Sequence, residues 1–522
     1  MVSRRQPPVI VVGAGVGGLA CAIDLAARGV QVTVLERAAQ PGGKMRAQAI
    51  GGQLLDAGPT VFTMRWVFDE LFAAAGASLD AQVSLTPLQT LARHAWAPDQ
   101  RMDLHRDLER SVDQIARLAG PAAGRGYRDF CVRAQRIHDT LERPFLRAAR
   151  PNPVSLLTRA GVRGLPSMLR IAPFATLWSA LGSHFQDPRL RQLFGRYATY
   201  CGSSPFQAPA TLMLVAHVER QGVWTLGEGM HGLAGVLMRL AQSLGVRLHC
   251  GTQVSEILLG AAGANGVRLA DGERLDASAV VFNGDSAALG QGLLGVDVAR
   301  RLQPAAAAQR SLSAITWNLI VPTEGMALAR HNVFFSADSE REFRELVVDK
   351  RLPTDPTVYV CAQDSIEPGV DGVAPAQRLL CLVNAPAQTG ANPLSEQELQ
   401  RCEQNLLLRL RRCGLKLQLE PGATPTLRTT PADFERLFPG SGGALYGTAS
   451  HGWKASFRRP GSRTKIRQLY LAGGTTHPGP GVPMAALSGR LAAASLLQDW
   501  AMGPVSMPGW RPAATAGGIS MR

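Results

Sequence analysis

Three glycines and one glutamate near the start of the chain have the types and spacing that dinucleotide binding requires. Gly13, Gly15 and Gly18 form a GxGxxG pattern, and Glu36 follows 18 residues after the last of them. In such a pattern the first glycine permits a tight turn, the second lets a pyrophosphate approach the backbone, and the third allows a helix to pack closely. We expect Glu36 to accept hydrogen bonds from ribose hydroxyls.

The residues around this turn have the pattern of a strand, a helix and a second strand. Residues 9–12 are all β-branched and apolar, residues 19–29 have a helical pattern, and residues 30–35 are again mostly apolar. A helix that begins at the glycine turn directs unpaired N–H groups and the positive end of its dipole at the phosphates. The unit therefore predicts an α/β protein with a Rossmann-type dinucleotide-binding domain.

The composition indicates a large folded protein. The chain has 522 residues, of which 46% are apolar and 18% charged, so we expect two or three domains. No apolar run is long enough to span a membrane. The eight cysteines are scattered without a CxxC pair, which argues against a metal site or disulfides and favours a reducing, cytoplasmic environment.

The excess of positive charge indicates an anionic partner. The net charge is +15, and because no nucleic-acid-binding module is present we expect lipid rather than nucleic acid. Residues 143–186 hold six arginines and no acidic residue, among apolar side chains and prolines. This is typical of a helical cap on a membrane surface. An amphipathic subdomain with solvated arginines would look the same, so both interpretations stay open.

The rest of the chain contains elements that return to the first domain. A hairpin is expected around Asp271 and Gly272, and a buried strand at residues 280–283 would rejoin the parallel sheet. Other expected strands lie at residues 246–249, 253–258, 314–321, 357–362 and 379–384, and expected helices at residues 233–244, 395–412 and 484–500.

Four segments together resemble one family. They are ERAAQPGGK at residues 36–44, DAGPT at residues 56–60, GVWTLGEGMHG at residues 222–232, and LYLAGGTTHPGPGVP at residues 469–483 with SGR at residues 488–490. In this order they resemble the FAD-dependent carotenoid desaturases, the phytoene-desaturase-like flavoproteins. Further segments are similar to the hydroxyneurosporene (methoxyneurosporene) desaturases of that family. These segments are residues 58–68, 194–200, 216–219 and 356–364.

The resemblance implies FAD as the cofactor and a chain divided into interleaved domains. Besides the discontinuous FAD-binding domain, we expect a mixed α+β substrate domain and a helical, membrane-associated insert. The expected boundaries are 1–85, 222–300 and 430–505 for the FAD-binding domain, 86–221 for the insert, 301–429 for the substrate domain and 506–522 for a tail.

The resemblance also implies which residues hold FAD. Lys44 would pair with phosphate or the flavin edge, although a solvated loop lysine is the alternative, and the Val254 backbone would meet adenine. Together with Gly13, Gly15, Gly18 and Glu36, the expected cofactor residues are Arg37, Gly43, Lys44, Gly58, Pro59, Thr60, Val254, Gly473, Gly474, Gly481, Val482, Pro483 and Met484.

The implied reaction removes a hydride from an allylic carbon and a proton from its neighbour, creating the C3–C4 double bond of a 1-hydroxyneurosporene-type carotenoid. It needs a long, dry, apolar tunnel. The expected catalytic residues are His477, Arg65 and Arg196, with Glu228 and His231 as further candidates. His477 would alternatively bind loop carbonyls, and Asp56 would fix the turn at Gly58. Aromatic candidates for the tunnel wall are Phe62, Trp66, Phe68, Phe194, Tyr197, Tyr200 and Trp224.

The implied partners are an acyclic hydroxylated C40 carotenoid, a lipid surface, and oxygen or a quinone as electron acceptor. We expect a peripheral location on the cytoplasmic side of the inner or photosynthetic membrane. Phytoene desaturation, flavin-dependent amine oxidation and a non-catalytic prenyl-binding role are the alternatives. The intact glycine pattern with Glu36 argues against the last of these.

Overall fold

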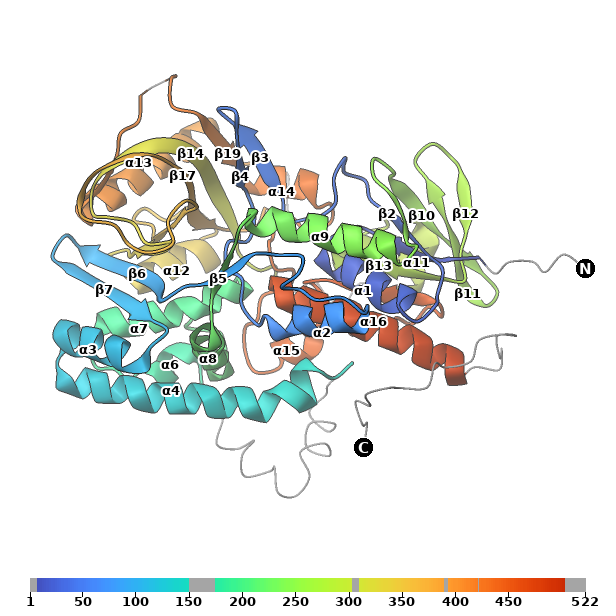
Figure 1. Cartoon of the computed structure of the whole chain (residues 1–522), viewed down its shortest axis with the longest axis horizontal. Helices are drawn as coiled ribbons and strands as arrows, with labels where there is room; N and C mark the ends of the chain where they lie inside the picture. The colour runs from blue at the N-terminus through green and yellow to red at the C-terminus, as the bar shows by residue number, and fades with distance from the viewer. Residues whose placement is uncertain (1–6, 150–173, 303–308, 389–392, 421, 503–522) are drawn as a thin grey trace, which may run out of the picture.

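The computed structural model describes residues 7–149, 174–302, 309–388, 393–420 and 422–502, and two large sheets organise them (Figure 1). The first sheet is parallel, with the strand order β20-β13-β1-β2-β9. Its strands are β1 (Val9–Val12), β2 (Val32–Leu35), β9 (Arg247–His249), β13 (Ala279–Phe282) and β20 (Leu469–Leu471). Three distant segments of the chain therefore build one sheet.

Helices from equally distant segments pack together beside this sheet. They are α1 (Val16–Ala26), α2 (Trp66–Ala74), α9 (Gly229–Ser243) and α16 (Val482–Met502). The crossing of α1 with α16 is very close, because a Cβ on Gly489 would lie 2.0 Å from the carbonyl oxygen of Gly17. This close crossing fixes the position of the start of α16 relative to the start of α1.

A small antiparallel sheet and two short helices follow β9. The strands are β10 (Val254–Gly260), β11 (Gly263–Leu269) and β12 (Arg274–Asp276), and the helices are α10 (Ser286–Gly290) and α11 (Val296–Leu302). Strands β11 and β12 pair through the expected turn, where Gly272 has a φ of +94°. The hairpin prediction is therefore confirmed.

The second large sheet has eight strands in the order β18-β14-β17-β16-β15-β6-β7, with β19 also paired to β14. Helix α13 (Glu396–Arg412) begins at a capping box formed by Ser395 and Glu398 and contacts β16 and β18. The strands are β6 (Thr90–Ala97), β7 (Gln100–His105), β14 (Ser313–Gly325), β15 (His331–Phe334), β16 (Val358–Ala362), β17 (Gly372–Ala385), β18 (Leu415–Leu417) and β19 (Thr426–Thr429).

A group of helices lies beside β6 and β7 (Figure 1). They are α3 (Leu108–Ala119), α4 (Pro121–Leu141), the π-helical η1 (Glu142–Leu146), α6 (Leu177–Leu181), α7 (Pro188–Gly195), η2 (Arg196–Cys201), η3 (Ala210–Met213) and α8 (Leu214–Gln221). Within the described ranges, no helix has the length and apolar character that crossing a membrane requires. Most of the arginine-rich segment, residues 150–173, lies outside the described residues.

The expected helical insert at residues 86–221 also contains strands. β6 pairs in parallel with β15, which brings residues 90–105 into the second sheet. Arg93 and His94 obscure the apolar alternation of β6, but Arg93 is paired with Asp103 at 2.8 Å and His94 is buried. Shorter elements complete the described fold, namely β3 (Ala47–Ile50), β4 (Gln53–Asp56), β5 (Leu85–Pro87), β8 (Trp224–Leu226), α12 (Ser339–Val347), α14 (Pro431–Leu437) and α15 (Ala455–Arg458).

Candidate active site

One cavity of about 1850 Å³ extends from the carboxyl ends of the parallel strands to the second sheet. Val12, Leu35 and Phe282, the last residues of β1, β2 and β13, lie at one end, and Tyr359 and Leu380 of the second sheet lie at the other. A cavity for one small molecule usually measures about 300–1,000 Å³. This cavity therefore has room for a dinucleotide with a second ligand beside it.

The turn between β1 and α1 forms the first part of the cavity wall. Gly13 has a φ of +103°, and both Gly13 and Gly15 line the cavity. No side chain caps the first turn of α1, so its N–H groups remain available to a phosphate. Gly18 lies behind the wall, where a Cβ would be 2.1 Å from the carbonyl oxygen of Gly13.

The carboxylate of Glu36 lines the cavity beside this turn. Its Oε2 accepts the N–H of Ala14 at 2.7 Å, and its Oε1 accepts the N–H of Ala38 at 2.8 Å. These bonds fix the side chain, and each oxygen keeps a further lone pair for a ribose hydroxyl. Arg37 and Val254 line the same end of the cavity.

Asn283 is a residue of this site that the sequence patterns did not single out. It directly follows β13, and its side-chain amide donates to the backbone of the β1–α1 turn at 3.2 Å. A Cβ on any of four glycines would lie 2.7–2.9 Å from this amide; they are Gly15, Gly17, Gly18 and Gly473. A polar residue immediately after a buried strand was the available signal.

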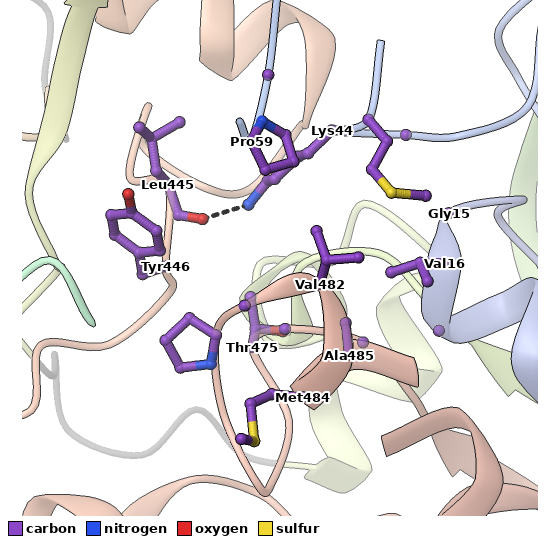
Figure 2. A pocket seen from close by; sticks show the side chains of 18 of the residues that line it. Gly15, Val16, Lys44, Pro59, Leu445, Tyr446, Thr475, Val482, Met484 and Ala485 are labelled. Carbon is purple, nitrogen blue, oxygen red and sulfur yellow. Dashed lines mark hydrogen bonds between the residues drawn. The ribbon is translucent and has the colours of Figure 1, made fainter. Parts of the chain in front are cut away.

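Lys44 occupies the middle of the wall. Its Nζ donates to the carbonyl oxygen of Leu445 at 2.5 Å (Figure 2) and lies 5.4 Å from the centre of the Phe438 ring. Burial lowers the pKa of Lys44, Asp285 raises it and Arg310 lowers it further. The side chain therefore lines the cavity and does not project into bulk solvent, which corrects the alternative of a solvated loop lysine.

The segment after β4 adjoins Lys44. A Cβ on Gly58 would lie 1.9 Å from the carbonyl oxygen of Lys44, so only glycine permits this approach. Gly58, Pro59 and Thr60 line the cavity together with Gly43. The Thr60 hydroxyl lies 2.6 Å from the phenol oxygen of Tyr359, which connects this segment to the second sheet.

Asp56 holds the N-terminus of α9. Its carboxylate accepts the N–H groups of Met230 and His231 at 2.8 and 3.0 Å, and lies 2.8 Å from His231 Nδ1. The expectation that this side chain fixes the turn at Gly58 is therefore wrong. The N–H groups at the start of a helix have no partner within the helix, so the buried carboxylate accepts hydrogen bonds from them instead. His231 and Glu228 both line the cavity.

The C-terminal segment brings a second helix N-terminus to the cavity. Figure 2 shows the start of α16, with Val482, Met484 and Ala485, near Val16 of α1. The N–H of Gly473 donates to the Ser488 hydroxyl at 3.2 Å, which ties the strand end to α16. The expected residues of this segment that line the cavity are Gly473, Gly474, Gly481, Val482, Pro483 and Met484.

The shape and chemistry of this wall fit FAD. The start of α1, which no side chain caps, and the start of α16, whose first turn has no acidic residue, can face anionic or developing negative charge, and the glycines leave space that a Cβ would fill. Glu36 offers ribose acceptors at the end of β2. All the expected cofactor residues except Gly18 lie on one continuous surface, although each individual contact with FAD stays a prediction.

Two expected catalytic residues lie off the cavity wall. Arg65 pairs with Asp69 at 3.2 Å and with Asp80, so opposite charges hold it at the surface. His477 is buried, and its Nε2 lies 2.9 Å from the carbonyl oxygen of Phe145. Burial lowers the pKa of His477 to about 4. Neither side chain therefore lines the cavity, and His477 contacts a loop carbonyl, as the alternative interpretation expects.

Arg196, the third expected catalytic residue, lines the cavity. Of the seven expected aromatic wall residues, Tyr200 alone does so among the described residues. The physical reason is that the others fill the cores between elements, as Phe62 does against Phe68 at a ring-centre distance of 5.3 Å. The expectation of a place on the tunnel wall is therefore wrong for Phe62, Trp66, Phe68, Phe194, Tyr197 and Trp224.

Comparison with known proteins gives matches over nearly the whole chain. The family model described as flavin containing amine oxidoreductase matches residues 16–497. The hydroxyneurosporene desaturase of Rubrivivax gelatinosus is 51% identical, with 94% of each chain covered. That of Cereibacter sphaeroides is 44% identical, with 95% of this chain and 98% of that protein covered.

More distant proteins share the fold. The phytoene desaturase of Neurospora crassa is 30% identical, with 95% of this chain and 86% of that protein covered. Among solved structures, an oxidoreductase from Methanosarcina mazei has a TM-score of 0.59 at 16% identity, covering 94% of this chain and 100% of its own. Putrescine oxidase with bound putrescine has a TM-score of 0.58 at 14% identity, covering 95% of this chain and 99% of its own.

Proposed function

The chain belongs to the flavin-containing amine oxidoreductase family, and from this premise we propose that it is an FAD-dependent desaturase that introduces the C3–C4 double bond into 1-hydroxyneurosporene-type carotenoids. The observation that carries the proposal is one continuous cavity, in which a dinucleotide cradle extends into a space that reaches the second sheet. The three hydroxyneurosporene desaturases that match over 94–95% of this chain support the substrate class.

The glycine turn, Glu36 and the start of α16 would hold FAD. When bound, it supplies the oxidant that accepts a hydride from an allylic carbon. The chain's own contribution is to orient the polyene and to exclude water from the positive charge that develops on it. Apolar side chains of η3, α8 and β17 serve this purpose at the wall, namely Leu212, Leu214, Val215, Val218, Leu380 and Leu382.

The carotenoid needs a path from lipid, and an aromatic series at the cavity offers one. The Phe145 ring lies 5.8 Å from Phe457, Phe457 lies 6.5 Å from Trp453, and Trp453 lies 5.3 Å from Phe174. All four line the cavity, and Phe174 is 71% exposed. We propose that this end rests on the cytoplasmic side of the inner or photosynthetic membrane, and that electrons leave to oxygen or a membrane quinone.

The test is desaturation by the purified, FAD-loaded protein in liposomes that contain 1-hydroxyneurosporene. The expected product has two hydrogen atoms fewer and one more conjugated double bond, seen by mass and by a red-shifted spectrum. Glu36→Ala should weaken FAD retention, whereas Glu273→Ala, a loop residue away from the cavity, should not. Oxidation of phytoene in place of the hydroxylated carotenoid would overturn the substrate assignment.

Amine oxidation is the second candidate, because putrescine oxidase shares the fold. At 14% identity that likeness extends to the fold alone. Peroxide release with putrescine or other amines, measured in the same preparation without carotenoid, would favour it. We expect no amine-dependent peroxide.

A further inference from the structure

A cluster of buried and half-buried polar side chains interrupts the apolar part of the cavity wall. Its members are Arg196 of η2, Tyr200 of η2, Glu219 of α8 and Tyr359 of β16. Three different elements of the fold therefore bring polar groups together where a hydrocarbon chain would otherwise meet only apolar groups. Buried polar groups are costly unless they are paired, so the pairing within this cluster decides its function.

Glu219 is the best-paired member. Its Oε1 accepts the hydroxyl of Tyr200 at 2.7 Å, and its Oε2 accepts the hydroxyl of Tyr197 at 2.8 Å. Burial raises the pKa of Glu219, while the two tyrosine hydroxyls and the charge of Arg196 lower it. A carboxylate has about four lone-pair positions, so each oxygen keeps one for a further donor.

Arg196 is the member whose side chain forms no hydrogen bond with the described residues. Its Nε is buried and unpartnered, and its guanidinium donates to no acceptor in the part of the chain that the structure describes. It lies 5.4 Å from the centre of the Tyr359 ring, a cation–π distance. A buried guanidinium with unused donors is expensive, and a ligand oxygen in the cavity would remove that cost.

The same residues border a second, smaller cavity of about 30 Å³. Arg196, Tyr200, Glu219 and Tyr359 separate it from the large cavity, and His331 lies on its far side, 2.8 Å from the Tyr359 hydroxyl. This volume holds at most one or two waters. The small cavity can supply water to Arg196 Nε from behind, but it cannot hold a substrate group.

The charges of the cluster limit the ligand. A carboxylate would approach Glu219, and an ammonium group would approach Arg196, so either ion meets a like charge. An uncharged hydroxyl suits both, because its oxygen accepts from the guanidinium and its hydrogen is donated to the free lone pair of Glu219. An ether or a pure hydrocarbon would leave one or both of these groups unpaired.

The cluster also lies near the cofactor segment. Tyr359 contacts the hydroxyl of Thr60 at 2.6 Å, and Tyr446, which lines the same cavity, lies beside Lys44 and Pro59 (Figure 2). In a 1-hydroxylated carotenoid the hydroxyl carbon is separated by one carbon from the bond to be oxidised. A hydroxyl site close to the flavin segment is what oxidation at C3–C4 requires.

We propose that Arg196 and Glu219, with Tyr200 holding Glu219 in place, bind the terminal hydroxyl of the carotenoid and thereby select the hydroxylated substrate and the bond that is oxidised. The proposal rests on the proposed function and deepens it. It makes Arg196 a substrate-binding residue that positions the chain end, without a part in proton transfer.

The test compares 1-hydroxyneurosporene with neurosporene, which lacks the hydroxyl, in FAD-loaded wild type and in Arg196→Met. A hydrogen bond to a charged group changes discrimination by roughly 10- to 100-fold. We therefore expect Arg196→Met to lower kcat/KM for the hydroxylated carotenoid by this factor and leave the value for neurosporene unchanged. Arg196→Lys keeps the charge and should restore part of the preference.

The matched control is Arg191→Met, five residues upstream, where the guanidinium donates to the Phe185 carbonyl oxygen at 2.7 Å and does not line the cavity. Binding of both carotenoids, followed by quenching of tryptophan fluorescence, gives a readout independent of turnover, and flavin content reports folding.

Equal losses for the two carotenoids in Arg196→Met, with normal flavin content, would overturn the hydroxyl site. If Arg196→Met does not fold, Tyr200→Phe must shift the same ratio, and an unchanged ratio there overturns it too. Failure of the wild type on both carotenoids would refute the proposed function instead.

Discussion

His477 illustrates how burial decides the protonation state of one residue. Because a carbonyl oxygen can only accept, the 2.9 Å contact with Phe145 requires that Nε2 carries a hydrogen. Burial lowers the pKa of His477 to about 4, from its ordinary value of 6.5. A depressed folded-state pKa means that the stabilisation is present above pH 6.5 and is lost as the pH falls toward 4.

We expect His477→Gln to make stability less dependent on pH in this window, because a glutamine amide donates to the same carbonyl and does not titrate. The histidine accounts for up to ~3 kcal/mol of wild-type stability lost between pH 6.5 and 4. Thermal unfolding midpoints of both proteins at pH 7, 5 and 4 measure the difference. The other buried histidines remain in both proteins and cancel; they are His94, His105, His138, His217 and His331.

The same variant separates the two roles of this residue. A buried anchor predicts that FAD-loaded His477→Gln keeps most of its desaturase activity at pH 7. A variant that folds and binds FAD normally but has lost turnover would return His477 to the chemistry.

At the residue scale the sequence predicts those side chains whose type alone limits their role. Gly13, Gly18 and Glu36 lie where the spacing places them, because a turn, a close helix contact and a strand end each permit few residue types. Asn283 was not predicted as a site residue, and the sequence did not define the role of Arg196. Asparagine and arginine occur in many ordinary positions, so only the neighbours in three dimensions reveal these two.

At the scale of elements, the crossing of α1 and α16 joins the first and last parts of the FAD cradle. Gly489 of α16 faces the backbone of Gly17 in α1, and the next residue, Arg490, pairs with Asp24 of α1 at 3.3 Å and with Glu70 of α2 at 2.7 Å. The position of α16 over the cavity therefore depends on residue 489 being a glycine, which has no side chain.

We expect Gly489→Ala to destabilise the protein by about 1–3 kcal/mol, because overpacking outweighs the better helix propensity of alanine. FAD affinity should fall as well, since the start of α16 would move from the wall. Thermal unfolding and flavin titration measure the two effects. Gly235→Ala in α9 is the matched control, because its Cβ would have its nearest contact at 3.5 Å; a Gly489→Ala variant as stable as this control would contradict the packing argument.

Strands with long apolar runs were predictable, whereas the limits of the second sheet were not. β1 and β13 read as buried strands because all their residues are apolar. β17 begins at Gly372, seven residues before the expected strand, because its first half is largely exposed and contains a glycine and a proline, which are typical of loops. The prediction of aromatic wall residues was mostly wrong for a related reason, since an aromatic side chain fits a core and a cavity equally well.

At the scale of the whole molecule, the cavity is a product of how two sheets are placed. Its ends come from β2 and β16, which are more than three hundred residues apart in sequence. Local patterns predict each sheet but carry no information about the space between them. The expectation of a long cavity beside the cofactor came from the resemblance, and the structure has one continuous cavity that reaches the second sheet.

The proposed contact with lipid rests on charge and on exposed aromatic groups. The net charge of +15 attracts it to an anionic surface, and Phe174 and Trp453, 71% and 36% exposed, stand at the cavity with Lys454 5.2 Å from the Trp453 ring. An aromatic pair beside a lysine is suited to the boundary between head groups and acyl chains.

We therefore expect the protein to sediment with vesicles of phosphatidylglycerol and phosphatidylcholine more than with phosphatidylcholine alone, and less as salt is raised from 0.1 to about 0.5 M. Replacing both Phe174 and Trp453 by serine should weaken binding by about tenfold or more, since each large side chain contributes up to about 1.5–3 kcal/mol when buried in lipid. Val370→Ser is the control, because that side chain is 95% exposed and does not line the cavity. Unchanged binding of the double variant would mean that the carotenoid enters the cavity from another side.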